Sequence, residues 1–273
     1  MSRREIETGT QTCEAYVDDG VAVITLNRPE ARNALSRPML DALETTLDHA
    51  ERAPDVRVVV VTGVGKAFCA GGDVKSMAAG QASELTLDER IHLQRLSQRN
   101  TAGRMYLMPK PVIAALPGAA AGAGLSIALA ADLRVMADTA FITTAFARVG
   151  FSGDYGGTYF LSQLVGQGKA REMYFLSSRV TAAQCLELGI ANRVVPVAEL
   201  LEQTMTLARQ LTAGPPIAYR YMKENFNRVA QGADVIECLD LEATHHVHSG
   251  LSDDHKNAAQ AFVDKREPVF KGA

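Results

Sequence analysis

The stretch that decides the fold is "PVIAALPGAAAGAGLSIALAADL" (111–133), which runs into a further apolar segment, "LRVMAD" (133–138). Its length raises the question of a membrane-spanning helix, which needs about 20 consecutive apolar residues. However, Pro117 and three glycines interrupt the stretch, and alanine supplies much of its apolar character. Proline and glycine end regular elements and mark turns. We therefore predict a buried strand, a turn, a buried helix and a second strand, with no membrane span.

The same alternation continues on the N-terminal side. "EAYVDDGVAVITLN" (14–27) has two apolar runs around an Asp-Asp-Gly turn, which is typical of a β-hairpin. Residues 34–55 have Ser36 as a candidate N-cap and leucines at helical spacing, which predicts a helix. "DVRVVVVTG" (55–63) is a β-branched run typical of a strand buried on both faces. The resulting order, β-β-α-β-loop-β-α-β, predicts an α/β fold.

Two further segments set the organisation of the chain. Residues 75–105 are polar and irregular, and we predict a mobile segment between strands there. After Pro196 the pattern is helical to the end. The simplest division is a core over residues 1–196 and a helical region over 197–273.

Composition limits the class of protein. The chain has 273 residues, and its 28 basic and 31 acidic residues give a net charge of −3 without a long run of one sign. Such a balance does not favour nucleic-acid binding. The four cysteines lack paired CxxC spacing, which indicates reduced thiols and a cytoplasmic location. "MSRREIETGTQ" at the start has no apolar h-region, so we expect no secretory signal.

Two glycine-rich stretches each follow a predicted strand: "KAFCAGGDVKSM" (66–77) and "GAAAGAGLSIALA" (118–130). Small residues at a strand-to-helix junction leave backbone N–H groups uncovered. Two such junctions, brought together, would aim a pair of donors at one oxygen and form an oxyanion hole. The alternative is that these glycines only allow tight packing. Neither stretch has the spacing of a Walker or dinucleotide-binding loop.

Three other groups have a functional and a structural interpretation. His245 and His248 share a helical face, but two histidines do not complete a metal site, and a solvated or interface helix is favoured. Cys69 is a possible nucleophile, although a free cysteine is more often a small buried hydrophobe. Asp154, in "FSGDYGGTYF" (151–160), either caps a turn or transfers a proton.

Taken together, these stretches resemble the enoyl-CoA hydratase/isomerase (crotonase) family. The resemblance lies in "LNRPEARNALS" (26–36), "AFCAGGDVKSM" (67–77), residues 111–138, "GKAREMYFLSSRVTAAQCLELGIANRVVP" (168–196) and "FVDKREPVFKG" (262–272), and it covers nearly the whole chain. It implies an α/β crotonase spiral of ββα units. It also implies a C-terminal helical region that forms trimers, often paired into hexamers, and contributes a lid to the site.

The resemblance also implies roles for individual residues. The N–H groups of Gly72 and Ala123 would hold the thioester oxygen, and Asp154 would be catalytic. Ala70 would contact the adenine of coenzyme A. The remaining candidate substrate- and coenzyme-A-binding residues are Ala31, Arg32, Gly71, Asp73, Val74, Lys75 and Phe146. Members of the family accept acyl-CoA thioesters and need no metal or redox cofactor, so coenzyme A enters only as part of the substrate.

The chain departs from the family at the two glutamates that hold water in its hydratases. Ser126 and Phe146 occupy these positions, and neither side chain is a general base at neutral pH. Asp154 matches the catalytic acid of the family's aspartate-dependent isomerases, including the phenylacetate-pathway ring-epoxide isomerase. One carboxylate suffices to move a double bond, because it can take a proton from C2 and return it to C4.

The leading hypothesis is therefore an enoyl-CoA isomerase whose acyl pocket is kept dry by Phe146, Phe151, Tyr155 and Phe160. A dehalogenase of the family would share Asp154, but those enzymes rely on a tryptophan, and this chain has none. Two alternatives stay open: a hydratase that works without the glutamate pair, and an acyl-CoA-binding protein without activity.

Overall fold

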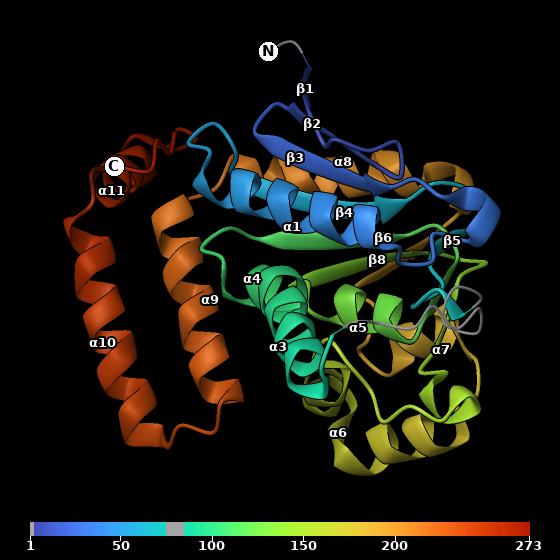
Figure 1. Ribbon diagram of the computed structural model, residues 1–273. Coiled ribbons are helices and arrows are strands. Elements are labelled where there is room, and N and C mark those ends of the chain that lie inside the picture. The colour runs from blue at the N-terminus through green and yellow to red at the C-terminus, as the bar shows by residue number, and fades with distance from the viewer. Residues whose placement is uncertain (1–2, 75–84) are drawn as a thin grey trace.

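The computed structural model describes residues 3–74 and 85–273. Its larger sheet (Figure 1) contains, in spatial order, β1 (Arg4–Ile6), β2 (Cys13–Asp18), β3 (Val21–Leu26), β4 (Val58–Gly63), β6 (Val112–Leu116), β8 (Leu133–Ala137) and β11 (Arg193–Val195). The pairs β1–β2 and β2–β3 are antiparallel, and every pair from β3 to β11 is parallel. The predicted hairpin is confirmed, because β2 and β3 pair across Asp19 and Gly20.

The smaller sheet contains, in spatial order, β10 (Val180–Thr181), β9 (Phe141–Thr143), β7 (Ala119–Ala121) and β5 (Ala67–Cys69). Three successive strand pairs, β4–β5, β6–β7 and β8–β9, each give their first strand to the larger sheet and their second to the smaller one. The chain therefore winds as a spiral of repeated two-strand turns, and the predicted α/β spiral of ββα units is confirmed. The sequence shows no matching repeat, because the short second strands carry no periodic pattern.

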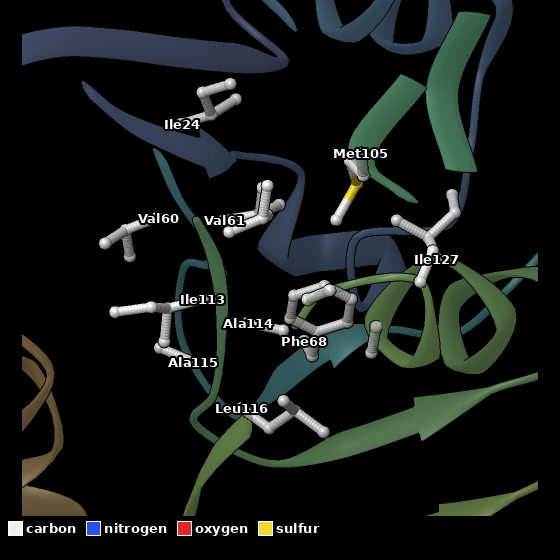
Figure 2. Packing of buried hydrophobic residues seen from close by; sticks show 14 of the residues in the cluster. Ile24, Val60, Val61, Phe68, Met105, Ile113, Ala114, Ala115, Leu116 and Ile127 are labelled. Atoms are coloured by element: carbon white, nitrogen blue, oxygen red, sulfur yellow. The ribbon is translucent and has the colours of Figure 1, made fainter. Parts of the chain in front are cut away.

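The core lies between the sheets and the helices that cover them. The four valines Val58–Val61 are completely buried in β4, as expected for a central parallel strand. Two helices, α1 (Arg37–Arg52) and α8 (Leu200–Thr212), pack against the larger sheet from opposite sides (Figure 1). Figure 2 shows Phe68 of β5 between Ala114 of β6 and Ile127 of α5 (Ala123–Leu129), so this ring joins the two sheets.

The alanine-rich stretch forms the predicted strand, turn and helix. All seven residues of α5 are buried. No helix in the described parts of the chain is long and apolar enough to cross a membrane. The helix predicted over residues 34–55 is α1, which begins after Ser36, although the Ser36 hydroxyl makes no capping hydrogen bond.

The prediction of an irregular segment over residues 75–105 is wrong for its second half. Residues 87–107 form α3 (Leu87–Gln98), a π-helical turn η2 (Arg99–Gly103) and α4 (Arg104–Leu107). Thr86 and Glu89 form a reciprocal capping box at the start of α3. That TxxE pattern was readable in the sequence. The helix itself is not predicted from periodicity, because α3 is exposed along most of its length and lacks an apolar stripe.

The last helices are α9 (Pro216–Ala230), α10 (Val235–Leu251) and α11 (Asp253–Asp264), which confirms the helical pattern after Pro196. In Figure 1, α9 and α10 stand side by side at the edge of the molecule, away from the sheets. Lys223 is the buried residue of α9, and its Nζ contacts Asp132 Oδ2 and the Met105 carbonyl oxygen, each at 2.8 Å. A buried ion pair therefore fastens this helical hairpin to the core.

The remaining elements connect the spiral. They are η1 (Pro29–Ala31), η3 (Phe146–Val149), α6 (Gly157–Leu176), α7 (Ala182–Glu187) and η4 (Val197–Glu199). The helix α6 is interrupted at Gly166, whose φ of 74° and ψ of 158° are not helical.

Candidate active site

The first glycine turn follows β5 and is held by the loop that follows β3. The Arg28 guanidinium forms an ion pair with Asp73 at 2.7 Å, and the Leu35 N–H donates to the Gly71 carbonyl at 2.8 Å. Gly71 has a φ of 90°, which glycine adopts without strain. These contacts fix the backbone of the turn before any ligand binds.

Asn33 organises the loop after β3, and the sequence analysis did not single it out. Its side chain is completely buried and accepts from the Arg28 N–H at 2.8 Å. It also donates to the carbonyl oxygens of Val64 and Ala67, at 3.0 and 2.8 Å. Asparagine tolerates the left-handed backbone at this position, where φ is 55°. The signal for this role was an asparagine within the family's opening motif, but spacing alone does not identify its hydrogen-bond partners.

The two glycine turns lie against each other. A Cβ added to Gly71 would stand 2.8 Å from the Ala121 carbonyl oxygen and 3.4 Å from the Ala123 nitrogen. A side chain at residue 71 would therefore push the turns apart. The two junctions that would form the oxyanion hole therefore lie in contact, and the oxyanion hole itself stays a prediction.

Each turn presents a backbone amide without an acceptor among the described residues. Ala123 is the first residue of α5, and the first bond within the helix is from the Ser126 N–H to the Gly122 carbonyl. The Ala123 N–H is thus one of the unpaired donors at a helix start. The Gly72 N–H likewise has no acceptor in the described part of the chain. Two free donors on touching turns can bind one negatively charged oxygen.

Other glycines in these stretches serve close packing, as the alternative interpretation proposed. A Cβ added to Gly124 would lie 2.7 Å from the Cys69 sulfur. Burial raises the pKa of Cys69 to about 12, and its sulfur accepts from the Gly71 N–H at 3.4 Å. Cys69 is therefore a buried thiol rather than a nucleophile.

Asp154 lies in a tight loop between η3 and α6. Gly153, Tyr155 and Gly156 around it have φ angles of 124°, 46° and 74°. The Gly157 N–H donates to the Asp154 carbonyl at 3.0 Å and closes the loop. This backbone is one that glycine favours, which explains the glycines on both sides of the aspartate.

The Asp154 carboxylate does not cap this loop. Its Oδ1 is buried and has no hydrogen-bond partner, and no described residue donates to either oxygen. Burial raises the pKa of Asp154 from the ordinary 3.8 to about 6. A half-buried carboxylate with one buried, unpaired oxygen and a pKa close to neutrality is suited to proton transfer and marks a functional site.

The carboxylate lies near the glycine turns. Its charge contributes to the raised pKa values of Cys69 and Tyr174. A Cβ added to Gly157 would clash with the Ser126 hydroxyl, so the Asp154 loop packs on the first turns of α5. The acid and the helix that carries the free Ala123 amide therefore share one site.

Phe146 and Tyr174 form the wall beside the second turn. Phe146 is 5 % exposed, and its ring stacks on Tyr174 with 5.7 Å between centroids. A Cβ added to Gly122 would lie 3.7 Å from the Phe146 ring. Ser126 is buried, and its hydroxyl donates to the Gly122 carbonyl at 3.3 Å. The two positions without glutamate therefore hold an aromatic ring and a hydroxyl that is already occupied.

The other predicted pocket residues are spread out. Tyr155 is 4 % exposed, whereas Phe151 is 57 % exposed. Phe160 packs against the Tyr106 ring, with 5.4 Å between centroids. A dry wall made by all four aromatic residues is thus wrong for Phe151, whose ring faces outward.

The predicted coenzyme A residues surround the first turn. Ala31 and Ala70 are half-buried, while Arg32 and Val74 are exposed. The Ala70 N–H donates to the Arg32 carbonyl at 3.0 Å, so these residues are adjacent. Asp73 holds the turn through Arg28, and Lys75 lies outside the described residues.

The histidines of α10 have structural contacts. His245 is buried, and its Nδ1 lies 2.5 Å from Asn225 Oδ1 and its Nε2 3.2 Å from Glu224 Oε2. Its ring stacks on Tyr221 at 4.3 Å between centroids. Across residues 3–74 and 85–273, no group of three His, Cys, Asp or Glu side chains is arranged to hold a metal ion.

Comparison with known proteins agrees with this geometry. A family model described as enoyl-CoA hydratase/isomerase matches residues 17–273. YngF of Bacillus subtilis (strain 168), named for enoyl-CoA hydratase/isomerase, is 36% identical over 93% of this chain and 96% of its own. The 1,2-epoxyphenylacetyl-CoA isomerase of Escherichia coli (strain K12) is 33% identical over 94% of this chain and 97% of its own.

A solved structure gives the same result. The crystal structure of an enoyl-CoA hydratase from Bacillus anthracis superposes with a TM-score of 0.88 and is 32% identical, covering 96% of this chain and 100% of that one. The fold is therefore the crotonase fold that the resemblance implied. On the family-model match over residues 17–273 and the identity to these relatives, this chain belongs to the enoyl-CoA hydratase/isomerase family.

Proposed function

We propose that this enzyme is an enoyl-CoA isomerase that moves a double bond along an acyl-CoA thioester. The observation that carries the proposal is the half-buried Asp154 carboxylate, whose Oδ1 has no hydrogen-bond partner, on a loop packed against α5, the helix that carries the free Ala123 amide. The names of related proteins include both hydratase and isomerase, so the choice between these reactions is made here from the site.

In the proposed reaction the thioester oxygen binds between the N–H groups of Gly72 and Ala123. Asp154 removes a proton from C2 of a 3-enoyl chain, and the electron pair moves onto the thioester oxygen as an enolate. The two amides stabilise that charge as it develops. Asp154 then returns the proton to C4, which gives the 2-enoyl thioester. No water is added, and coenzyme A takes part only as the thioester group.

The surroundings of Asp154 favour isomerisation over hydration. Hydration needs a water held by a base and an acid at once, whereas the described site offers one unpaired carboxylate. Phe146 fills the wall where a second acid would stand, and the Ser126 hydroxyl donates to the Gly122 carbonyl. A base with a pKa of about 6 is ionised at pH 7 and still gives the proton back readily.

The proposal includes self-association and the surroundings in which the enzyme works. Many large apolar side chains of α9, α10 and α11 are exposed in the single chain: Met222, Phe226, Val229, Val235, Ile236, Leu239, Val247, Leu251, Phe262 and Val263. Exposed apolar patches of this extent commonly mark contacts with another protein chain. We assign these helices to a homotrimer, or to a hexamer of two trimers, in the cytoplasm, where the four free cysteines would stay reduced.

The reaction is tested with matched 3-enoyl-CoA and 2-enoyl-CoA thioesters in deuterated water, followed by mass spectrometry. We expect the double bond to move and deuterium to enter at C2 or C4. Gain of the mass of water would identify a hydratase instead and would overturn the proposal. Thermal stabilisation by acyl-CoA without any turnover would identify a binding protein.

A further inference from the structure

The direction of the Asp154 side chain depends on the residue that follows it. Tyr155 has a φ of 46°, a left-handed backbone that residues with a side chain rarely adopt. Such a conformation persists only where surrounding contacts impose it. The contacts that hold Tyr155 therefore also determine where the Asp154 carboxylate points.

Two of these contacts come from the end of α3. The Tyr155 N–H donates to Gln98 Oε1 at 2.9 Å, and the Tyr155 hydroxyl lies 3.2 Å from the Ser97 hydroxyl. Ser97 and Tyr155 are both buried. The C-terminal end of α3 therefore holds Tyr155 through both its backbone N–H and its side-chain hydroxyl.

The end of α3 is itself anchored. It continues into the π-helical turn η2, where the buried Thr101 hydroxyl donates to the Ser97 carbonyl at 2.8 Å. The turn η2 packs against α1 and α5. π-Helical turns of this kind are frequent at functional sites. A continuous set of contacts therefore runs from the core, through η2, to the loop of the acid.

We propose that Gln98 is a positioning residue: its side-chain oxygen holds the Tyr155 amide and thereby aims the Asp154 carboxylate at the acyl group. The inference rests on the proposed function, because it assigns a target to the carboxylate. Gln98 acts through Tyr155 and does not itself exchange a proton.

The charged and titratable groups near this arrangement are few among the described residues. Cys69 of β5 and Tyr174 of α6 face Asp154, and burial raises their pKa values, so both are neutral at pH 7. On α1, Glu44 raises the pKa of Tyr155 and Arg37 lowers it. The pKa of Asp154 is therefore set by its burial. The contacts of Gln98 and Ser97 with Tyr155 maintain that burial.

The test compares Gln98→Leu with Gln98→Glu and Gln184→Leu. Leucine removes the acceptor, and glutamate keeps a carboxyl oxygen for the Tyr155 N–H. Gln184 is the matched control, because its Oε1 also accepts a backbone N–H at 2.9 Å, from Thr181 of β10 at the start of α7, and both residues are exposed. Each variant is assayed for kcat, KM and the pH dependence of 3-enoyl-CoA isomerisation.

We expect Gln98→Leu to lower kcat by about 100-fold with KM within about threefold, because a misplaced catalytic group costs rate more than binding. The acid limb of the pH–rate profile of Gln98→Leu should move below pH 6, because the loop is no longer held by Gln98 and Asp154 becomes exposed to water. Gln98→Glu should recover most of the kcat at high pH, with the limb moved upward by the added negative charge. Gln184→Leu should match the parent enzyme.

Unchanged kcat and pH dependence in Gln98→Leu would overturn the inference, as would an equal loss in Gln184→Leu. The proposed function is judged separately by Asp154→Asn, which should be inactive whatever Gln98 does. If the parent enzyme does not isomerise, NMR titration of the ¹³C-labelled Asp154 carboxyl still decides. A lower pKa in Gln98→Leu supports the positioning role, and an unchanged pKa refutes it.

Discussion

Asp154→Asn should both abolish most of the catalytic activity and stabilise the folded protein. The change removes the charge and keeps the shape of the side chain. A positioned general base contributes about 10²–10⁴-fold to rate, so we expect a loss of turnover in that range. Binding of acyl-CoA should change little, because the two backbone amides remain.

The gain in stability follows from the pKa of the buried acid. Burial raises that pKa from 3.8 to about 6, which corresponds to at most about 3 kcal/mol of destabilisation once the group is ionised. A raised carboxyl pKa means that the folded state binds the proton more tightly than the unfolded state. The destabilisation is therefore absent below pH 3.8, develops between pH 3.8 and 6, and is complete above it. For 273 residues, 3 kcal/mol corresponds to about 5 °C in Tm.

The assay is denaturant unfolding of the parent enzyme and Asp154→Asn at fixed protein concentration, from pH 4 to pH 8. We expect the two stabilities to converge at pH 4 and to separate, with asparagine higher, at pH 8. Asp48→Asn, in an ion pair on α1, is the control and should show no such gain. If Asp154→Asn were less stable at pH 8, the carboxylate would be a structural cap and our reasoning would be refuted.

Three further outcomes test other parts of the structure. Gly71→Ala should reduce kcat by about 10²–10³-fold, because its Cβ would press on the Ala121 carbonyl and separate the two amides; unchanged kcat would contradict the oxyanion assignment. Lys223→Ala should cost up to about 3 kcal/mol in urea unfolding, because the half-buried Asp132 loses its charged partner and keeps the Val112 N–H, and Lys223→Ala with Asp132→Asn should recover part of that loss. Asn33→Ala should lose about 2–3 kcal/mol, since it removes three hydrogen bonds of the loop after β3; if that loop binds coenzyme A, as the family resemblance implies, KM should rise more than kcat falls, and an unchanged KM would argue against that role.

The parts of the fold that could be predicted are those with a strong local pattern. The valines of β4 and the alternating residues of the β2–β3 hairpin are read directly from their apolar runs. The strands β5, β7 and β9 have only three residues each and no pattern of their own, because their pairing is decided by the spiral. The helix α3 has a capping signal but no buried face, so a search for amphipathic periodicity passes over it.

The site divides in the same way. Gly71, Gly72, Ala123 and Asp154 could be identified as candidates from residue type and from the family motifs. The partners of these residues were not, because they come from distant segments: Gln98 lies 57 residues before Tyr155. Whether the Asp154 carboxylate caps a turn or has no hydrogen-bond partner is decided by the three-dimensional structure, since both arrangements are compatible with the same flanking glycines.

Different functional groups follow the three strand pairs of the spiral. The first ends at Gly72 and the second at Ala123, each offering a backbone amide, whereas the third leads through Phe146 to Asp154. Main-chain amides are supplied by any sequence that can follow the turn, but a carboxylate must be encoded. A change of reaction on this scaffold therefore needs new side chains, at residue 126 of α5 or after the third strand pair, whereas the two backbone amides remain in any sequence that follows both turns.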